Sequence, residues 1–318
     1  MRSTGRPDLE PRFEDRVVFS TDLVRIGAFR CDRDHVSFRE SAPIENYCFW
    51  FPRTPVVIEP EHEPAFVVNP NIATFYNKSQ TYGRHAVGDH GDNSDWFGVD
   101  RELLCDALRD RLPGVGGEPA HLFPFSHCAV DARTYLLQRQ IFEAVKAGPR
   151  LDAFEVEEIV VLLLDRMIEH AVGPVADRRS AILRQHRNLA IEAEILLSDR
   201  FDEALSLDSI AKQVGASVFH LCRTFRRVTG ATLHQYRTSL RLRASLERIS
   251  ESAETLTDVA VGLGFANHSH FTCAFRHEFR QLPSAYRTAC GTALRLPPRT
   301  RPRPRHHEKR PHLAEETE

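Results

Sequence analysis

The chain has 318 residues, of which 42 are Lys or Arg and 44 are Asp or Glu, so its formal net charge is −2. At about 150 residues per domain this length predicts two domains, and the apolar fraction of 42% excludes a wholly disordered chain. The longest purely aliphatic run, 159–164, is too short to cross a bilayer. Residues 1–15 lack the apolar core of a secretory signal. We therefore expect neither a membrane partner nor export.

The N-terminal part of the sequence predicts a short arm and then a β-rich domain. Residues 1–15 are polar and contain two prolines, so we expect a flexible arm. Residues 16–130 contain short runs rich in Val, Ile, Phe, Tyr and Trp that prolines separate, a pattern typical of a small sandwich or barrel. The predicted strands are 23–29, 47–51, 56–58, 66–68, 72–76 and 96–99, followed by a short helix over 102–111.

Residues 131–172 predict two helices, over 131–146 and 152–170, each ending at a Gly-Pro pair. The second helix has a wide apolar stripe, which either packs in the core or pairs with the same helix of a second subunit. On the second interpretation, residues 131–172 form a dimerisation segment and the protein is a homodimer. Residues 173–180 begin with Gly-Pro and continue with charged side chains, so they predict a linker.

Seven cysteines, at positions 31, 48, 105, 128, 222, 273 and 290, are scattered, and no two form a C-x-x-C pair. This pattern favours reduced thiols over a disulfide framework or a structural zinc site. It predicts a cytoplasmic location and no cofactor.

Residues 181–290 predict an all-helical domain that contains an internal repeat. The pattern Ile210-Ala211-x-x-Val214-Gly215 recurs 49 residues later, and the following pairs His-Leu/Phe, Phe-Arg and Tyr-Arg recur 50 residues later. In each copy, a Ser, Thr or Asn suited to capping a helix precedes a short helix, a glycine turn and a second helix. Two short helices joined by a glycine turn describe a helix-turn-helix, whose second helix enters the major groove of DNA.

Charge supports this interpretation of the repeat. Residues 1–187 contain 23 basic and 29 acidic side chains, a net charge of −6, whereas residues 218–243 contain six arginines and no acidic residue. A local basic stripe on an acidic protein is typical of a nucleic-acid contact. Between the copies, residues 233–249 predict one long helix of about 26 Å. A helix of this size can space two recognition helices one DNA turn apart, about 34 Å.

The residues 291–318 form an Arg- and Pro-rich tail with almost nothing apolar to bury, and we expect them to be disordered. The fold class expected for the whole chain is therefore α+β with two domains. The first is β-rich with added helices, and the second is all-α with two helix-turn-helix motifs joined by a long helix.

The repeat resembles the AraC/XylS family of bacterial transcription regulators over residues 189–288. The motifs that carry the resemblance are SLDSIAKQVGASVFHLCRTFRRVTG and LTDVAVGLGFANHSHFTCAFRHEFRQLPSAYR. The resemblance implies sequence-specific binding to a double-stranded DNA operator, an N-terminal domain that senses an effector or dimerises, and RNA polymerase as a partner if the protein activates transcription. The strand-rich part resembles the cupin-type barrel of many family members.

The same resemblance assigns DNA contacts by position. In the first recognition helix, Phe219, Cys222 and Arg223 stand where the family meets base edges; in the second, His268, Ser269 and Thr272 do. Arg226, Arg227 and Arg276 are placed for phosphates. The helix starts and flanking positions complete the expected DNA-contacting set with Ser217, Val218, His220, Asn267 and Cys273.

Two residues of the second motif depart from the family pattern. Cys273 stands where the family usually has Arg, and Arg280 stands where Gly is common after the recognition helix. An Arg can fork onto guanine O6 and N7, which a Cys cannot do. The sequence therefore predicts that the first motif, with Arg223, reads DNA more specifically than the second.

The β-rich domain offers weaker indications of function. Trp50 and Tyr76 could line an effector pocket, although aromatic residues in strands are more often core. His62, His85, His90, Asp89, Asp92 and Asp95 lack the spacing of a metal site, so we expect no metal and no catalytic residue. The alternatives from another class are a cupin-type metal enzyme, or a DNA alkyl-damage responder, fused to the DNA-binding domain.

Overall fold

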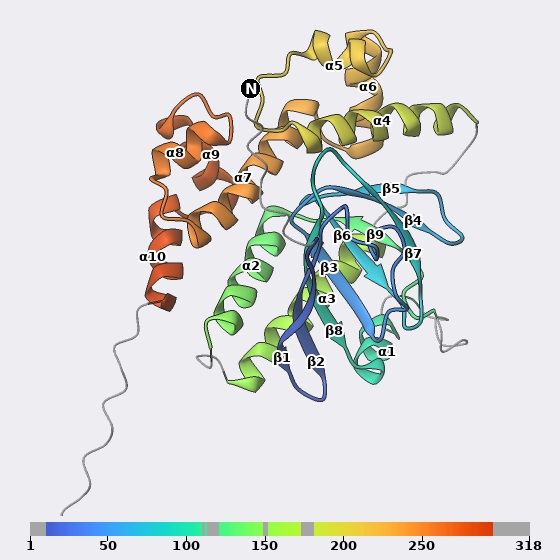
Figure 1. Ribbon diagram of the computed structural model, residues 1–318, viewed down its shortest axis with the longest axis vertical. Helices are drawn as coiled ribbons and strands as arrows, with labels where there is room; N and C mark the ends of the chain where they lie inside the picture. The colour runs from blue at the N-terminus through green and yellow to red at the C-terminus, as the bar shows by residue number, and fades with distance from the viewer. Residues whose placement is uncertain (1–10, 110–111, 113–120, 149–151, 173–180, 295–318) are drawn as a thin grey trace, which may run out of the picture.

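The computed structural model describes residues 11–109, 112, 121–148, 152–172 and 181–294. The expected linker over 173–180 and most of the expected tail, 295–318, lie outside these residues, as do residues 1–10 of the expected arm. The described residues form a β-rich region, up to residue 172, and a helical region, from residue 181 (Figure 1).

The described strands of the β-rich region form two antiparallel sheets. The first has six strands in the order β1-β2-β8-β3-β6-β9, and the second has three in the order β5-β4-β7. The strands are β1 (Phe13–Ser20), β2 (Val24–Cys31), β3 (Tyr47–Pro52), β4 (Val56–Pro60), β5 (Phe66–Val68), β6 (Ile72–Tyr76), β7 (Tyr82–Ala86), β8 (Asp92–Val99) and β9 (His127–Ala129).

The six-stranded sheet is the middle layer because both of its faces are buried. In β3, Cys48 and Trp50 point to the core between the two sheets, whereas Phe49 and Phe51 point to a core shared with helices. Successive residues of a strand face opposite sides, so an unbroken apolar strand such as β3 requires cover on both. The helices on the second face are α1 (Arg101–Arg109), α2 (Ala132–Lys146) and α3 (Ala153–Val172).

Most of the apolar stripe of α3 belongs to this core. Leu163 and Met167 have no exposed surface and pack in the chain's own core. The core interpretation is correct for these two side chains, which cannot form a dimer contact, whereas a dimerisation role for the rest of 131–172 stays a prediction. A helix beside a two-sided sheet needs its widest apolar face for the sheet, and on α3 only Phe154, Val161 and Leu162 among the large apolar side chains stay exposed.

The helical region contains both copies of the repeat. Its helices are α4 (Ala181–Asp199), α5 (Leu207–Gln213), α6 (Val218–Thr229), α7 (Leu233–Glu251), α8 (Leu256–Gly262), α9 (His268–Phe279) and α10 (Pro283–Leu294). In Figure 1, α7 runs between the α4–α6 group and the α8–α10 group. The predicted order of two helix-turn-helix units around one long helix is confirmed.

The two units differ in how they are buried. The first unit has a separate apolar core, made by α4, α5, α6 and the first half of α7. The second unit shares one continuous core with the β-rich region, because α2 packs against α7 and α9. The repeated sequence therefore produces two units with unequal attachment to the rest of the chain.

Two domain boundaries differ from the predictions, and strands β1, β7 and β9 were not predicted. Residues 13–15 are paired with β2 and are not part of an arm. Residues 291–294 continue α10, so they do not belong to a tail. Strand β7 was not predicted because its sequence, YGRHA, is polar, and a charged residue such as Arg84 normally indicates an exposed position. Arg84 is nevertheless buried, because Asp92 lies 2.8 Å away and neutralises its charge.

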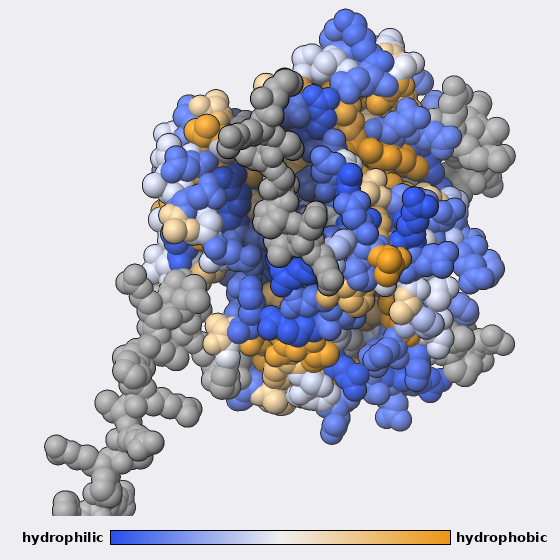
Figure 2. Space-filling view, in the orientation of Figure 1, coloured by the Kyte–Doolittle hydropathy of each residue, from blue (hydrophilic) through white to orange (hydrophobic). Residues whose placement is uncertain are grey.

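Hydrophilic side chains dominate the visible surface, and an apolar patch covers part of β1 and β2 (Figure 2). Val17 and Leu23, on and just after β1, are about half exposed. In the described ranges, no helix is long and apolar enough to span a membrane.

A buried polar junction joins the β-rich region to the first unit. The Asn69 amide donates hydrogen bonds to Ser198 Oγ at 3.0 Å and to Tyr236 Oη at 2.6 Å. Ser239 Oγ donates to Asn71 Oδ1 at 2.9 Å. Satisfied polar groups of this kind fix one packing arrangement, because any displacement leaves a buried group unpaired.

This junction predicts a pH dependence of stability. Burial of Glu194, opposed by a hydrogen bond with Tyr236, raises the pKa of Glu194 from 4.5 to about 7. Between these values the folded chain keeps a proton that the unfolded chain releases, so the free energy of unfolding falls as pH rises. Glu194→Gln is expected to remove this loss.

Urea titrations of Glu194→Gln and of the wild type at about pH 5 and about pH 8 measure the contribution. The free energy of unfolding of the variant, relative to that of the wild type, should be higher at about pH 8 than at about pH 5. The same difference between the two proteins at both pH values would contradict the prediction.

Candidate nucleic-acid interface

The first helix-turn-helix unit has the local geometry that its sequence predicts. Ser206 caps α5 by accepting from the Ser209 N–H at 3.1 Å. Gly215 makes the turn with φ of +66°, a conformation that favours glycine. Ser217 then caps α6 by accepting from the His220 N–H at 3.2 Å. The start of α6, the expected recognition helix, is thus set by three local residues.

The two faces of α6 separate core from charge. Leu221 and Phe225 are fully buried beneath the helix. The predicted DNA-contacting arginines Arg223, Arg226 and Arg227 are all exposed. Ser217 and His220 are also exposed, and Val218 and Cys222 are partly exposed. The side chain of Phe219 lies outside the part of the chain that the structure describes.

The three arginines border a hollow of about 750 Å³ between α6 and the start of α7. Its other lining residues are Leu207, Cys222, Thr232, Leu233 and His234. His234 is exposed at the first turn of α7, and it was not among the residues predicted from the sequence. There was little reason to select His234 from the sequence, because the second unit has Ser284 at the matching position of the repeat.

The second unit repeats the arrangement with a less basic surface. Thr255 caps α8 and Asn267 caps α9, each through a backbone N–H three residues later. Gly264 has φ of +76°, and a Cβ there would lie 2.1 Å from the Asp202 carbonyl oxygen, so no larger residue fits. Phe271, Phe275 and Phe279 form the buried face of α9.

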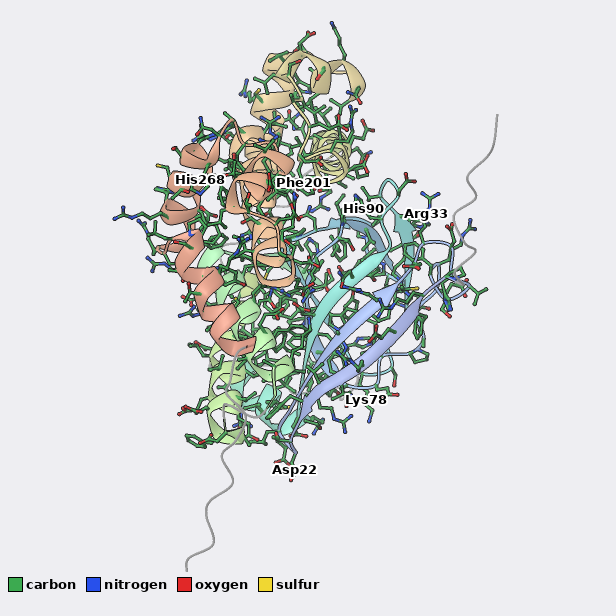
Figure 3. All side chains as sticks on the ribbon, turned by 60° about the vertical axis from the view of Figure 1, so that its left-hand side comes forward. Asp22, Arg33, Lys78, His90, Phe201 and His268 are labelled. Atoms are coloured by element: carbon green, nitrogen blue, oxygen red, sulfur yellow. The ribbon has the colours of Figure 1, made fainter. Side chains whose placement is uncertain are left out.

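The outer face of α9 carries the remaining predicted contacts. Asn267, Ser269, Cys273 and Arg276 are exposed, and His268 and Thr272 are partly exposed. In Figure 3, His268 lies at the outer edge of the helical region, on the side away from Lys78 of the β-rich region. The structure thus brings both predicted residue sets to accessible helix faces.

Arg280 ends α9 in the left-handed conformation, with φ of +58°, where the first unit has Gly230 with φ of +77°. A side chain in this conformation costs about 1 kcal/mol. Arg280→Gly is therefore expected to raise the free energy of unfolding by about 0.5–1 kcal/mol. Gly230→Ala is the matched control and should lower it by a similar amount.

Thermal and urea unfolding of both variants test this prediction. Arg280→Gly with unchanged or reduced stability would show that the Arg280 side chain makes stabilising contacts that outweigh the strain.

The predicted effector residues Trp50 and Tyr76 lie together between the two sheets. Their rings form an edge contact at 5.4 Å, and Trp50 also contacts Phe29 at 5.2 Å. Both side chains are buried, and the Trp50 indole donates to Cys48 Sγ. These contacts give both residues a place in a packed core.

The His and Asp residues of the β-rich region that were considered for a metal site are not brought together by the structure as described. Within the described residues, no group of three or more His, Cys, Asp and Glu side chains is close enough to hold a metal ion.

Comparisons with known proteins agree with the repeat. A family profile described as a helix-turn-helix domain matches residues 210–289. The regulatory protein SoxS of Salmonella typhimurium (strain LT2) is 34% identical over 91 residues, which are 29% of this chain and 85% of SoxS. The HTH-type transcriptional activator RhaS of Escherichia fergusonii is 30% identical over 175 residues, 53% of this chain and 60% of RhaS.

The match to RhaS therefore spans about three fifths of that protein, whereas the match to SoxS spans most of it. Among solved structures, ToxT from Vibrio cholerae O395 is 11% identical, and the alignment covers 85% of this chain and 99% of ToxT with a TM-score of 0.33.

Proposed function

Because the chain belongs to the AraC/XylS family of bacterial transcription regulators, we propose that it binds double-stranded DNA at specific sequences and regulates transcription there. The observation that carries the proposal is the pair of capped helices, α6 and α9, each with a buried apolar face and an accessible polar face. A recognition helix needs this division, since one face must hold it to the protein while the other reads base edges.

Charge supports DNA as the partner over a protein partner. The accessible face of α6 carries three arginines within five residues and no acidic side chain. Arginine binds phosphates and guanine edges, and the attraction of DNA for such a surface weakens as salt is added.

Selection from a random duplex library with the full chain tests the proposed function. We expect enrichment of a site with two half-sites about 10 base pairs apart, because α7 spaces the two units along one face of the duplex. Competition by unrelated duplex with equal strength would contradict sequence-specific binding.

The other partners in the proposal follow from the family. We propose a small-molecule effector for the β-rich region, a homodimer whose contact lies outside the buried stripe of α3, RNA polymerase if transcription is activated, and the cytoplasm as the location. The buried position of Leu163 and Met167 excludes those two residues from the dimer contact.

An effector that enters between the sheets should change tryptophan fluorescence. Trp50 and Trp96 are the only tryptophans, and both lie in the apolar core between the sheets. Because that core is packed around Trp50, a ligand that enters it changes the surroundings of the indole. Titration with a panel of metabolites should therefore shift the emission and raise the melting temperature together. A ligand that raises the melting temperature without changing the emission would place the effector site elsewhere.

A further inference from the structure

One face of α7, the helix between the two helix-turn-helix units, is held along its length by the β-rich region. Five residues of this face, at intervals of three or four, contact that region: Tyr236, Ser239, Arg243, Glu247 and Glu251. This spacing places them in one stripe along the helix. All five contacts are polar, so they have defined geometries.

The contacts near the middle and the start of α7 are hydrogen bonds. Tyr236 and Ser239 bond to Asn69 and Asn71 at the first unit. Arg243 donates to the Val130 carbonyl at 2.6 Å, and its guanidinium lies over the Tyr135 ring. These contacts fix the end of α7 that carries the first unit.

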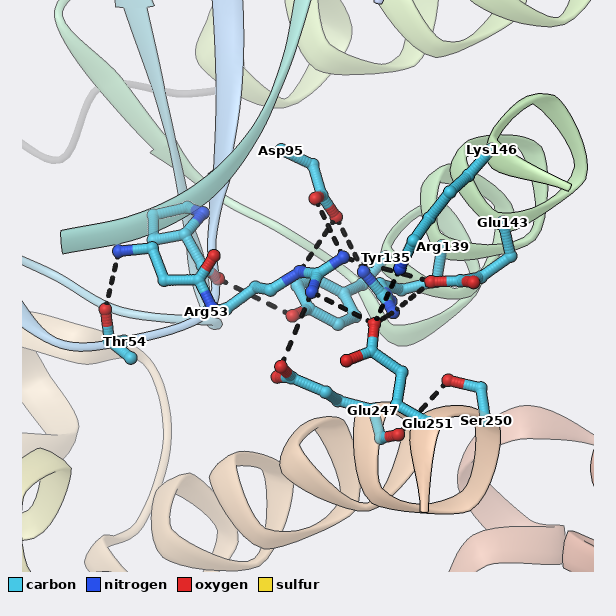
Figure 4. A network of polar contacts seen from close by, with 12 residues as sticks. Arg53, Thr54, Asp95, Tyr135, Arg139, Glu143, Lys146, Glu247, Ser250 and Glu251 are labelled. Carbon is cyan, nitrogen blue, oxygen red and sulfur yellow. Dashed lines mark hydrogen bonds and ion pairs between the residues drawn. The ribbon is translucent and has the colours of Figure 1, made fainter. Parts of the chain in front are cut away.

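The end of α7 that leads into the second unit is held by charge (Figure 4). Arg53, at the end of the neighbouring strand β3, is only 5% exposed and lies 2.9 Å from Asp95. The same guanidinium lies 3.4 Å from both Glu247 and Glu251. Arg53 therefore connects the β-rich region directly to the last turns of α7.

Helix α2 completes this cluster, which we call the α7 clamp: Arg53, Asp95, Arg139, Glu143, Lys146, Glu247 and Glu251. Arg139 lies 2.8 Å from Asp95, 2.7 Å from Glu143 and 3.7 Å from Glu251. Lys146 lies 3.3 Å from Glu251. Burial opposes ionisation of Glu251, yet Arg53, Lys146 and Arg139 outweigh it and lower its pKa, so Glu251 is charged at neutral pH.

We propose that Arg53 is a positioning residue for DNA recognition: through Glu247 and Glu251 it sets the place of the second recognition helix relative to the first. This inference rests on the proposed function. The chain passes from one unit to the other only through α7, and the clamp fixes the end of α7 from which α8 and α9 continue. The distance between half-sites that the protein accepts is then a property of the β-rich region as well.

A second brace lies within the helical region and limits the effect. Arg241 of α7 donates to the Phe201, Gly264 and Glu203 carbonyls, which joins the loop before α5 to the turn of the second unit. Loosening the clamp should therefore widen the range of arrangements of the two units, without separating them.

The test uses the full chain with Glu247→Gln and Glu251→Gln together, which keeps the side-chain shape but removes the charges that Arg53 holds. The matched control is Glu158→Gln with Glu192→Gln, which removes the same charge from exposed sites on α3 and α4. Glu251→Gln alone is the milder variant if the double variant does not fold.

The first measurement is affinity for the selected duplex and for versions with one base pair added or removed between the half-sites. Each protein's discrimination is the dissociation constant for an altered duplex divided by the dissociation constant for the selected duplex. We expect the clamp variant to lose about threefold or more of the wild-type discrimination, and the control to keep it. Equal discrimination by the clamp variant and the wild type would overturn the inference.

The second measurement needs no DNA, so it separates this inference from the proposed function. Hydrogen exchange of the free proteins should become faster in the last turns of α7 and in α8 of the clamp variant, and stay unchanged in the control. If the wild type binds no specific DNA, the proposed function fails. In that case, unchanged exchange in the clamp variant overturns the clamp as well, and faster exchange retains it as a structural brace.

Discussion

Replacing Arg139 with alanine is expected to lower the free energy of unfolding by about 3–5 kcal/mol. The Arg139 side chain is 1% exposed and neutralises Asp95 and Glu143. Its removal leaves two carboxylates without their closest cation, and Asp95 is itself buried. Because water does not reach the buried Asp95 carboxylate, the loss of folding free energy exceeds the value of the lost ion pair itself.

Arg109→Ala is the control for this prediction. Arg109 pairs with Asp106 at 2.8 Å, but both side chains are mostly exposed, so its loss should change stability by about 0–1 kcal/mol. Urea unfolding of the two variants, followed by tryptophan fluorescence, gives both values. A loss below about 1 kcal/mol for Arg139→Ala would mean that water reaches the clamp.

Replacing Arg223 with alanine is expected to weaken specific DNA binding by about 1–3 kcal/mol and to relax preference within one half-site. Arg223 is exposed on the accessible face of α6, one turn after the capped start of the helix. A guanidinium there can fork onto a guanine edge, and alanine offers no donor. Titration of labelled duplex at fixed salt measures the change.

Cys273→Ala is the matched control in the second unit. Cys273 is exposed at the corresponding position of α9, and a thiol is only a weak donor, so its loss should cost little. Cys273→Arg should tighten binding at low salt, because it adds a cation near the phosphates. Equal losses for Arg223→Ala and Cys273→Ala would show that the second helix is the main reader.

The repeated units were predictable from the sequence because their determinants are local. Ser206, Ser217 and Asn267 cap their helices by bonding to a backbone N–H three residues away, and Gly215 makes its turn through its own φ. Such residues act within one turn of chain, so a single sequence shows them.

The α7 clamp was not predictable, because its members are distant in the sequence. Arg53 and Glu251 are separated by 198 residues, and neither position departs from an ordinary surface pattern. Arg139 lies among the buried apolar residues Tyr135, Leu136 and Phe142 of α2. That position indicates a buried charge only once Asp95 is known to face it.

The wide stripe of α3 shows a different limit. Its periodicity predicted correctly that the face is buried. Periodicity does not say which surface covers the face, and here it is the six-stranded sheet of the same chain. The same limit applies to Trp50 and Tyr76: the sequence left an effector pocket and a core open for them, and the structure places both in a packed core.

The continuous core between the β-rich region and the second helix-turn-helix unit has a consequence for how the chain loses its structure. Heating should melt α8, α9 and α10 together with the sheets, because all of them contribute buried side chains to one continuous core. The first unit has its own core, so α5 and α6 can open while α7 stays held against the β-rich region. The two similar segments would then belong to different cooperative units, and the first recognition helix could adapt its shape to DNA at lower cost than the second.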